Sequence, residues 1–332
     1  MDPLTHTAVG LFLSRAGLKG WTPRASAIVL LAANAPDIDI VTSFGGSLNY
    51  LHYHRHLTHS LIASPALALL PVLLVGAVGR KRLNWRGAFF AAWIAVLLHL
   101  LLDLTNSYGI RLLLPFSGEW LRLDITNVID LWIWGVFLFA IAAPFLARLV
   151  TSEITSGASR GRPQGRGFAI FALVFLLVYE CGRGVLHASA AADLESRVYR
   201  GEAPLRVAAL PDAANPLRWR GLAETRDAYA VAEVDLMREF DPSGALSFHK
   251  TVLDPAIEAA RRTHTFQVFL TFAQFPFWRV TPVSEPEKGK RVEVLDMRFG
   301  SPAAPGFMAT AILDAQLRTV ETSFTFGTVR PR

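Results

Sequence analysis

The chain has 332 residues and a net charge of +6, and 52% of its residues are hydrophobic while only 18% are charged. Because average soluble chains carry about 25% charged residues, this composition predicts a membrane protein rather than a wholly soluble one. The basic residues gather in short loops beside apolar runs, which is typical of cytoplasmic loops and does not indicate a nucleic-acid partner. The single cysteine, Cys181, excludes a disulfide framework and a CxxC metal or redox motif.

The first part of the chain contains two short and four long apolar segments. The short ones, at about 5–18 and 24–35, are separated by the turn-forming stretch KGWTPR and predict a helical hairpin. The long segments are close to the ~17–25 residues that a helix needs to cross a bilayer. They lie at 61–79, 87–104, 128–150 and 168–186. Residues 1–187 are therefore predicted to form a helical membrane domain with four transmembrane helices.

Basic turns between these segments predict the orientation of the helices. The turns at 15–24, 80–86 and 148–166 are rich in arginine and lysine, and such turns face the cytoplasm. With four crossing helices, everything after about residue 187 then lies on the opposite side. The sequence thus predicts a multi-pass protein whose C-terminal domain is extracytoplasmic.

Residues 188–332 have the composition of an ordinary soluble domain. Segments rich in β-branched and aromatic residues alternate with clusters of Pro, Gly, Asp and Ser, which is a pattern of short strands and turns. The expected strands include AYAVAEVDLM, TFQVFLTFAQF, KRVEVLDMRF and LRTVETSFTFG. We predict a mostly antiparallel β domain, preceded by a short helix near 188–199. This domain would cap the membrane site, recognise its substrate, or serve as a separate interaction module.

Ionisable residues recur where the predicted membrane helices end on the extracytoplasmic side. They are His6, Asp37 and Asp39 in NAPDID, the histidines of HYHRHLTHS (His52, His54, His56 and His59), and His99 and Asp103 in HLLLD. Such residues are costly in membrane segments and mostly functional. His99 and Asp103 are four residues apart, so they share one helix face. They predict either a hydrogen-bonded pair or a metal site with nitrogen and oxygen ligands.

The histidine cluster allows two alignments, which the residues alone do not separate. If the segment is helical throughout, His52, His56 and His59 share one face. If a helix begins near Thr58, His54 lies in the preceding loop and His59 in the first turn.

Asp37 and Asp39 follow Pro36, which ends a helix or forces extended backbone before it. Asp37 is a candidate ligand because a carboxylate beside an apolar helix end is costly unless it has a function. Asp39 is equally compatible with a plain turn.

Four blocks of sequence across residues 1–130 resemble the YdjM-type inner-membrane metal-dependent hydrolases. They are an early His6, NAPDID, HRHLTHS and HLLLDLTNSYGIRLLLPF, and a later segment, NPLRWRGLAET, is also similar. The resemblance implies a bacterial inner-membrane location and a polar site of His6, Asp37, Asp39, His54, His59, His99 and Asp103. It favours His54 over His56, because the matching histidine precedes Arg55; His56 itself stands where a small residue is usual. A more distant similarity to helical zinc-dependent phospholipase C proteins points to a class of substrate.

Together these features predict a membrane-embedded hydrolase whose site lies at the outer face of the inner membrane. Two or more divalent ions, with zinc expected and manganese or magnesium as alternatives, would activate water on a phosphoester or lipid-linked ester. Asp39 would bridge the ions or orient an imidazole. Arg55 would hold an anionic phosphate or anchor the membrane interface. The alternative is a metal-binding transporter or sensor that hydrolyses nothing.

Overall fold

The computed structural model describes residues 1–79, 82–154, 165–252, 254–285 and 287–327. The chain forms two compact units, each built from segments that alternate along the sequence. The first contains Met1–Ile38, Arg55–Ala188 and Pro211–Leu217, and the second contains Asp39–His54, Ser189–Leu210 and Arg218–Arg332. The short segment Asp39–His54 therefore leaves the helical part of the chain and belongs to the β-rich unit.

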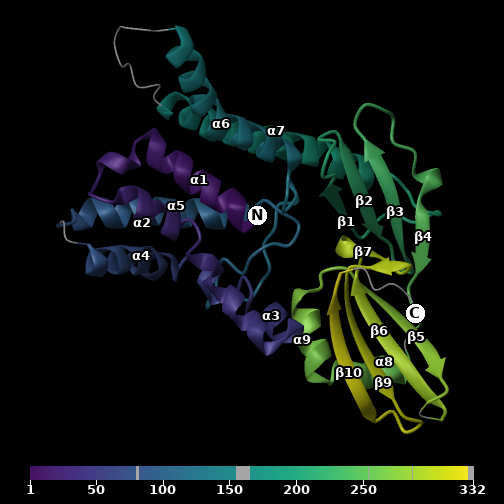
Figure 1. Cartoon of the computed structure of the whole chain (residues 1–332). Helices are drawn as coiled ribbons and strands as arrows, with labels where there is room; N and C mark the ends of the chain where they lie inside the picture. The colour runs from purple at the N-terminus through teal and green to yellow at the C-terminus, as the bar shows by residue number, and fades with distance from the viewer. Residues whose placement is uncertain (80–81, 155–164, 253, 286, 328–332) are drawn as a thin grey trace. The chain divides into compact units, whose positions relative to one another are not determined.

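The first unit is helical. Its helices are α1 (Pro3–Ala16), α2 (Ala25–Ala32), α4 (Ser64–Val78), α5 (Trp85–Leu104), α6 (Leu131–Ile154) and most of α7 (Arg166–Glu195) (Figure 1). The start of α1 is fixed by Asp2, whose side chain accepts the backbone N–H groups of Leu4 and Thr5, and by Pro3 at the first helical position.

Buried clusters among the described residues hold these helices together. One joins α2, α4 and α5, and another joins α1, α6 and α7. On α5 the buried face is a row of alanines, Ala88, Ala91, Ala92 and Ala95. Small residues let helices approach closely where lipid supplies no hydrophobic driving force between them. The alanine row thus explains why α5 lies at the centre of this packing.

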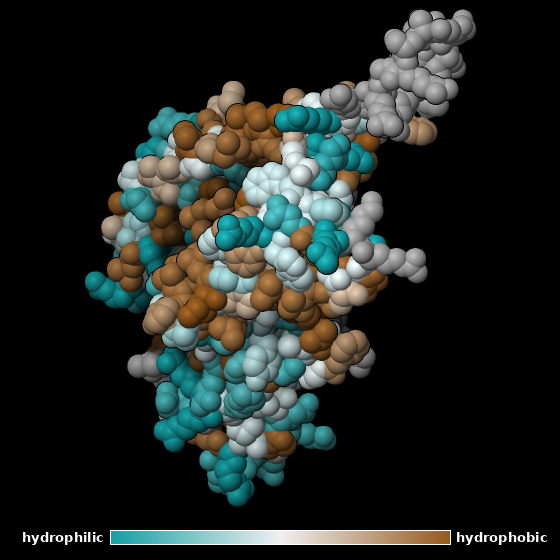
Figure 2. Space-filling model, turned by 90° about the vertical axis from the view of Figure 1, so that its left-hand side faces the viewer, coloured by the Kyte–Doolittle hydropathy of each residue, from teal (hydrophilic) through white to brown (hydrophobic). Residues whose placement is uncertain are grey.

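The described residues contain two helices that could span a membrane, or up to four spans if bent helix pairs are counted. The helices α5 and α7 are each long and apolar enough to cross a bilayer. Two bent pairs also qualify if each counts as one span: α2 with the 3-10 segment η2 (Pro36–Gly45), and Ser47–His59 with α4. Hydrophobic residues cover much of the face shown in Figure 2. A lipid bilayer is the environment in which such a surface is stable.

The second unit contains two four-stranded sheets. The first has the order β1 (Arg206–Pro211), β2 (Arg218–Glu224), β3 (Ala228–Asp235) and β4 (Leu246–His249). The second is antiparallel and has the order β10 (Thr319–Phe326), β9 (Phe307–Leu313), β6 (Gly289–Asp296) and β5 (Pro276–Val283), with α8 (Pro255–Arg261) and α9 (His264–Phe272) packed against it. A pair of two-residue strands, β7 (Gly300–Ser301) and β8 (Ala304–Pro305), completes the unit.

Two local expectations were wrong. The segment TFQVFLTFAQF forms the helix α9 and not a strand. Its buried residues Phe266, Phe269 and Phe272 recur every three positions and so share one helix face, and packing of that face overrides the strand preference of aromatic residues. A separate short helix near 188–199 is also absent from this described stretch, because α7 continues without a break to Glu195.

The second unit holds the segment that carries part of the histidine cluster. Helix α3 (Ser47–Tyr53) packs against α9 and β10. The Ser47 hydroxyl donates to the carbonyl oxygen of Phe324 at 3.2 Å, and the Tyr50 ring meets Phe326 edge to face at a centroid distance of 5.9 Å. The plait formed by α8, α9 and the second sheet therefore fixes where α3 lies within its unit.

Candidate metal centre

Four of the predicted ligands converge in the first unit: Asp37, His59, His99 and Asp103. Each offers one ligand atom, and these atoms all lie within 4.8 Å of one another. Three separate pieces of chain supply them. Helix α5 contributes His99 and Asp103, η2 contributes Asp37 just after Pro36, and the 3-10 turn η3 (Leu57–His59) ends on His59.

The two imidazoles meet through their Nε2 atoms, which lie 3.2 Å apart. The Nδ1 atom of His99 lies 2.8 Å from the carbonyl oxygen of Ala33, so it must carry the proton that it donates. The Nε2 atom of His99 then presents a lone pair to the cluster. Histidine metal ligands commonly donate their other N–H to a carbonyl in this way, because that contact fixes the tautomer and the ring orientation.

The carboxylates complete the group. Asp103 Oδ2 lies 3.2 Å from His59 Nε2 and 3.4 Å from His99 Nε2, and Asp37 Oδ1 lies 3.5 Å from His59 Nε2. The side chains of His59, His99 and Asp103 are fully buried, whereas Asp37 is 18% exposed. Of these four residues, Asp37 therefore marks the side on which the group can be reached.

The donor set fits a divalent metal ion. Asp37 Oδ2 and Asp103 Oδ2 are buried carboxylate oxygens that accept no hydrogen bond from any described residue. Such orphaned buried oxygens are costly unless something else satisfies them. Two imidazole nitrogens and two carboxylate oxygens suit zinc, and also manganese or other borderline ions.

His6 lies beside this group. Its ring stacks on that of His99 with centroids 3.7 Å apart, and its Nε2 atom is 3.3 Å from Asp103 Oδ1. Neither ring nitrogen of His6 has a hydrogen-bond partner among the described residues. Burial lowers the pKa of His6 well below its ordinary value, so the ring is neutral at pH 7 and offers a lone pair.

Arg55 is buried against the same carboxylate. Its Nη2 atom donates to Asp103 Oδ1 at 2.8 Å, and its Nη1 atom donates to the side-chain oxygen of Asn106 at 3.1 Å. The amino group of Met1 also contacts Asp103. Sequence reasoning missed Asn106, which is fully buried and also accepts the backbone N–H groups of Tyr108 and Gly109. Its position directly after HLLLDLT is the feature of the sequence that could have identified Asn106 as part of the site.

Asp39 and His54 form a pair of their own, and both belong to the second unit. Asp39 Oδ1 lies 2.9 Å from His54 Nδ1, and the ring of Tyr50 stacks on that of His54 with centroids 4.4 Å apart. A carboxylate at Nδ1 holds the imidazole in one orientation and leaves Nε2 as the ring's lone-pair atom. The structure groups these two residues with each other and with α3.

The histidine segment is not one helix. Helix α3 ends at Tyr53, His54 is extended, and Arg55 has a positive φ of 55°. The single helical face of His52, His56 and His59 therefore does not form. His54 does lie in a loop, but the following helix, α4, begins at Ser64 and not near Thr58.

The apolar helices and the buried aspartate–histidine group are features of a membrane protein with residues placed to hold a metal ion. The chain belongs to the YdjM inner membrane protein family, whose model matches residues 1–190. A second model, the YfhP C-terminal alpha/beta plait domain, matches residues 255–328. The chain is 24% identical to the "Uncharacterized protein YfhP" of Bacillus subtilis (strain 168) over an alignment 353 positions long. The alignment covers 98% of this chain and 94% of that protein.

The YdjM-type resemblance of the sequence is thus confirmed. The more distant similarity to phospholipase C proteins is shown by none of these comparisons, and no solved structure matches the chain.

The close contact of α1 with α2 gives a first prediction. A Cβ atom added at Gly10 would lie 2.8 Å from the Cβ atom of Ala33, whose carbonyl orients His99. We expect Gly10→Ala to force these helices apart, lowering the free energy of unfolding by about 1–3 kcal/mol and weakening metal binding. Thermal unfolding and metal titration of the purified protein measure both effects.

The matched control is Gly182→Ala in α7, where an added Cβ meets nothing within 4 Å. Alanine is preferred to glycine inside a helix by roughly 0.5–1 kcal/mol, so this variant should be at least as stable as the parent. A Gly10→Ala protein with unchanged stability and metal affinity would contradict the close packing of α1 on α2.

Proposed function

We propose that this protein is a membrane-embedded, metal-dependent hydrolase. The observation that carries the proposal is the convergence of Asp37, His59, His99 and Asp103, whose ligand atoms lie within 4.8 Å of one another in a largely buried site. Burying two carboxylates and two imidazoles together in an apolar helical unit is expensive. A bound cation is the simplest physical reason for the arrangement.

These four residues would hold a divalent ion, which would supply a Lewis acid and lower the pKa of a bound water. The chain's own groups prepare the site for it. The Ala33 carbonyl holds the Nε2 atom of His99 as a lone-pair donor. Arg55, which donates to Asp103, places one fixed positive charge beside two carboxylates. Asp37 is partly exposed, and a substrate would reach the site from that side.

We extend the ligand set to His6, Asp39 and His54 as part of the same proposal, with two or more ions in all. His6 supports this extension because its buried Nε2 atom lies 3.3 Å from Asp103 Oδ1. Asp39 and His54 support it because a carboxylate–imidazole pair is suited to hold an ion or to accept a proton. Asp39 would then orient His54.

For the substrate we propose a phosphoester or lipid-linked ester, such as a phospholipid. The support is that the chain carries helices long and apolar enough to cross a bilayer, one of which, α5, supplies His99 and Asp103. Substrates that are themselves anchored in the bilayer can reach such a site without leaving the membrane. Arg55 is the charged group that would hold a phosphate, once its contact with Asp103 is relieved.

The proposed topology is a short helical hairpin followed by four crossing helices in a bacterial inner membrane, with residues 188–332 outside the cytoplasm. It rests on the basic turns at 15–24, 80–86 and 148–166. We expect alkaline phosphatase fused after residue 332 to be active and green fluorescent protein at the same point to be dark. The opposite result would reverse the proposed orientation.

The test of function is metal analysis of the purified protein, followed by a screen of phosphodiester and phospholipid substrates with zinc or manganese. We expect bound divalent metal and hydrolysis that a chelator abolishes and the metal restores. Metal-dependent uptake into proteoliposomes without any hydrolysis would favour a transporter instead. A folded protein that binds no divalent metal would contradict both functions.

A further inference from the structure

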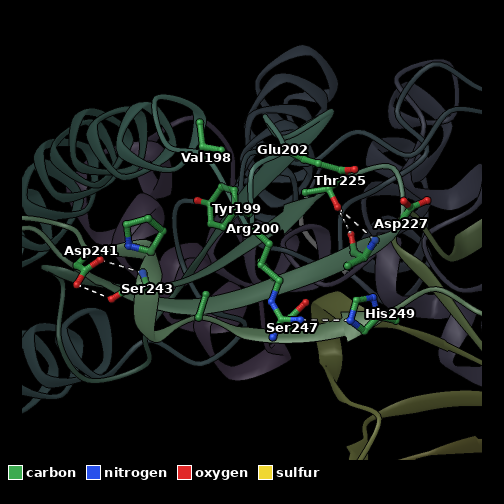
Figure 3. A pocket seen from close by; sticks show the side chains of 14 residues that line it. Val198, Tyr199, Arg200, Glu202, Thr225, Asp227, Asp241, Ser243, Ser247 and His249 are labelled. Atoms are coloured by element: carbon green, nitrogen blue, oxygen red, sulfur yellow. Dashed lines mark hydrogen bonds between the residues drawn. The ribbon is translucent and has the colours of Figure 1, made fainter.

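The second unit contains a cavity of about 490 Å³ beside β3 and β4, far along the chain from the metal ligands (Figure 3). Ala228 and Ala230 of β3 lie opposite His249 and Ser247 of β4, and alternate residues of a strand share one face. Three of these four side chains are small. The sheet is therefore hollow at this point, and His249 stands at the edge of the hollow.

Local contacts order the walls of the cavity. On one side, Tyr199 and Glu202 exchange backbone hydrogen bonds of 2.8 and 3.1 Å around a two-residue turn, and the Tyr199 hydroxyl donates to the carbonyl oxygen of Leu194. On the other side, the Asp241 carboxylate accepts the backbone N–H of Ser243 at 2.9 Å and its hydroxyl at 2.7 Å. The walls are thus formed before any ligand arrives.

Arg200 occupies a strained position in this turn. Its φ is 52°, followed by Gly201 at 89°. Left-handed backbone suits glycine or asparagine and is unfavourable for an arginine. The strained turn brings the Arg200 guanidinium to His249, where its Nη1 atom donates to Nε2 at 3.2 Å. Positive φ at both central residues is usual in a two-residue turn, and here the turn holds the exposed Arg200 guanidinium at the rim of the cavity.

The charges of the lining restrict the ligand. Three carboxylates, from Glu202, Asp227 and Asp241, lie on the two sides of Arg200, so the cavity repels an anion (Figure 3). The guanidinium between them opposes a cation. The apolar residues of the lining are Val198, Tyr199, Pro242 and three alanines, which form no long apolar channel for a lipid tail. A neutral molecule with many hydroxyl groups meets both demands, because each hydroxyl can donate to a carboxylate and accept from Arg200 or Ser247.

We propose that this cavity is a binding site for a neutral saccharide of one or two rings. The volume is within the range of small-molecule sites. Arg200 and His249 bind ring hydroxyls at the centre, and the flanking carboxylates bind hydroxyls at either end. The cavity shares no residue with the metal centre, so the proposal does not depend on the proposed hydrolase activity.

The test uses the full-length protein in lipid nanodiscs, because glucoside and maltoside detergents would compete for the cavity. Glucose, N-acetylglucosamine and maltose are the probes. Their binding is measured by saturation-transfer NMR and by calorimetry. We expect Arg200→Asn to raise Tm by about 2–4 °C through relief of backbone strain, while it weakens saccharide binding about tenfold or more. Ser247→Leu, which fills the floor, should also abolish binding.

Lys288→Asn is the matched control, because Lys288 also has a positive φ, of 58°, and does not line the cavity. It should raise Tm in the same way and leave saccharide binding unchanged. All these variants should keep their bound metal. The proposal is overturned if the folded protein binds none of the three sugars, if glucose 6-phosphate or choline binds in their place, or if Arg200→Asn binds them as tightly as the parent.

Discussion

Asp103→Asn is expected to yield folded protein without bound divalent metal and without hydrolytic activity. The Asp103 carboxylate is fully buried and reaches His59, His99 and His6 within 3.4 Å. An amide keeps the shape but loses the negative charge, and its NH₂ group would turn toward imidazole lone pairs. We expect metal affinity to fall at least ~100-fold. Hydrolysis should lose several kcal/mol of transition-state stabilisation, so its rate should fall steeply. Elemental analysis of the purified variant measures the first effect directly.

Asp130→Asn provides the control for this variant. Asp130 is another buried carboxylate of the helical unit, and it accepts the backbone N–H groups of Trp132 and Ile133 and the hydroxyl of Tyr179. Asparagine can keep the backbone contacts, and the residue is outside the metal group. Metal content should therefore match the parent. Retention of full metal by Asp103→Asn would refute the four-residue centre.

The second large effect is an asymmetry among the histidines. We expect His54→Ala and His59→Ala each to abolish metal-dependent hydrolysis, while His52→Ala is mild and His56→Ala intermediate. His59 points its Nε2 atom at the carboxylates of the metal group, and His54 is held by Asp39. His52 instead packs toward His264 of α9, with ring centroids 6.3 Å apart. Loss of a ligand removes several kcal/mol of catalysis, whereas loss of a packing contact costs little activity.

Asp39→Asn refines this experiment. If Asp39 orients the ring of His54, its loss should cost only ~10–100-fold in metal affinity or activity, and it should cost almost nothing further once His54 is alanine. Circular dichroism and thermal unfolding of each variant exclude misfolding. Essential His52 and His56 with a dispensable His54 would show that the ligand assignment is wrong.

Features that depend on neighbouring residues could be predicted from the sequence. His99 and Asp103 share a helix face because four residues make about one turn, and the structure brings them into one group. The apolar runs near 87–104 and 168–186 coincide with α5 and α7, because long stretches without charge leave few alternatives. Pro36 predicts that the preceding helix ends before Asp37, because proline disfavours helical backbone in the residue before it. Helix α2 does end there, at Ala32.

The course of the chain through HYHRHLTHS could not be predicted in this way. Which histidine joins the metal group depends on the break after Tyr53 and on the positive φ of Arg55, and that strained backbone is held by contacts with Asp103 and Asn106 far along the chain. The same holds for α9, whose aromatic residues favour a strand until a sheet is present to pack against.

The sequence by itself determined the family, the apolar helices α5 and α7 and the chemical nature of the site residues, because these follow from composition, periodicity and short motifs. Only the tertiary structure decided that Asp37, His59, His99 and Asp103 converge and that Asp39 contacts His54. The physical reason is that burial and long-range contacts select one backbone path among several with similar local preference. Helix α3 shows this directly, since its place is set by α9 and β10, which lie more than two hundred residues later in the chain.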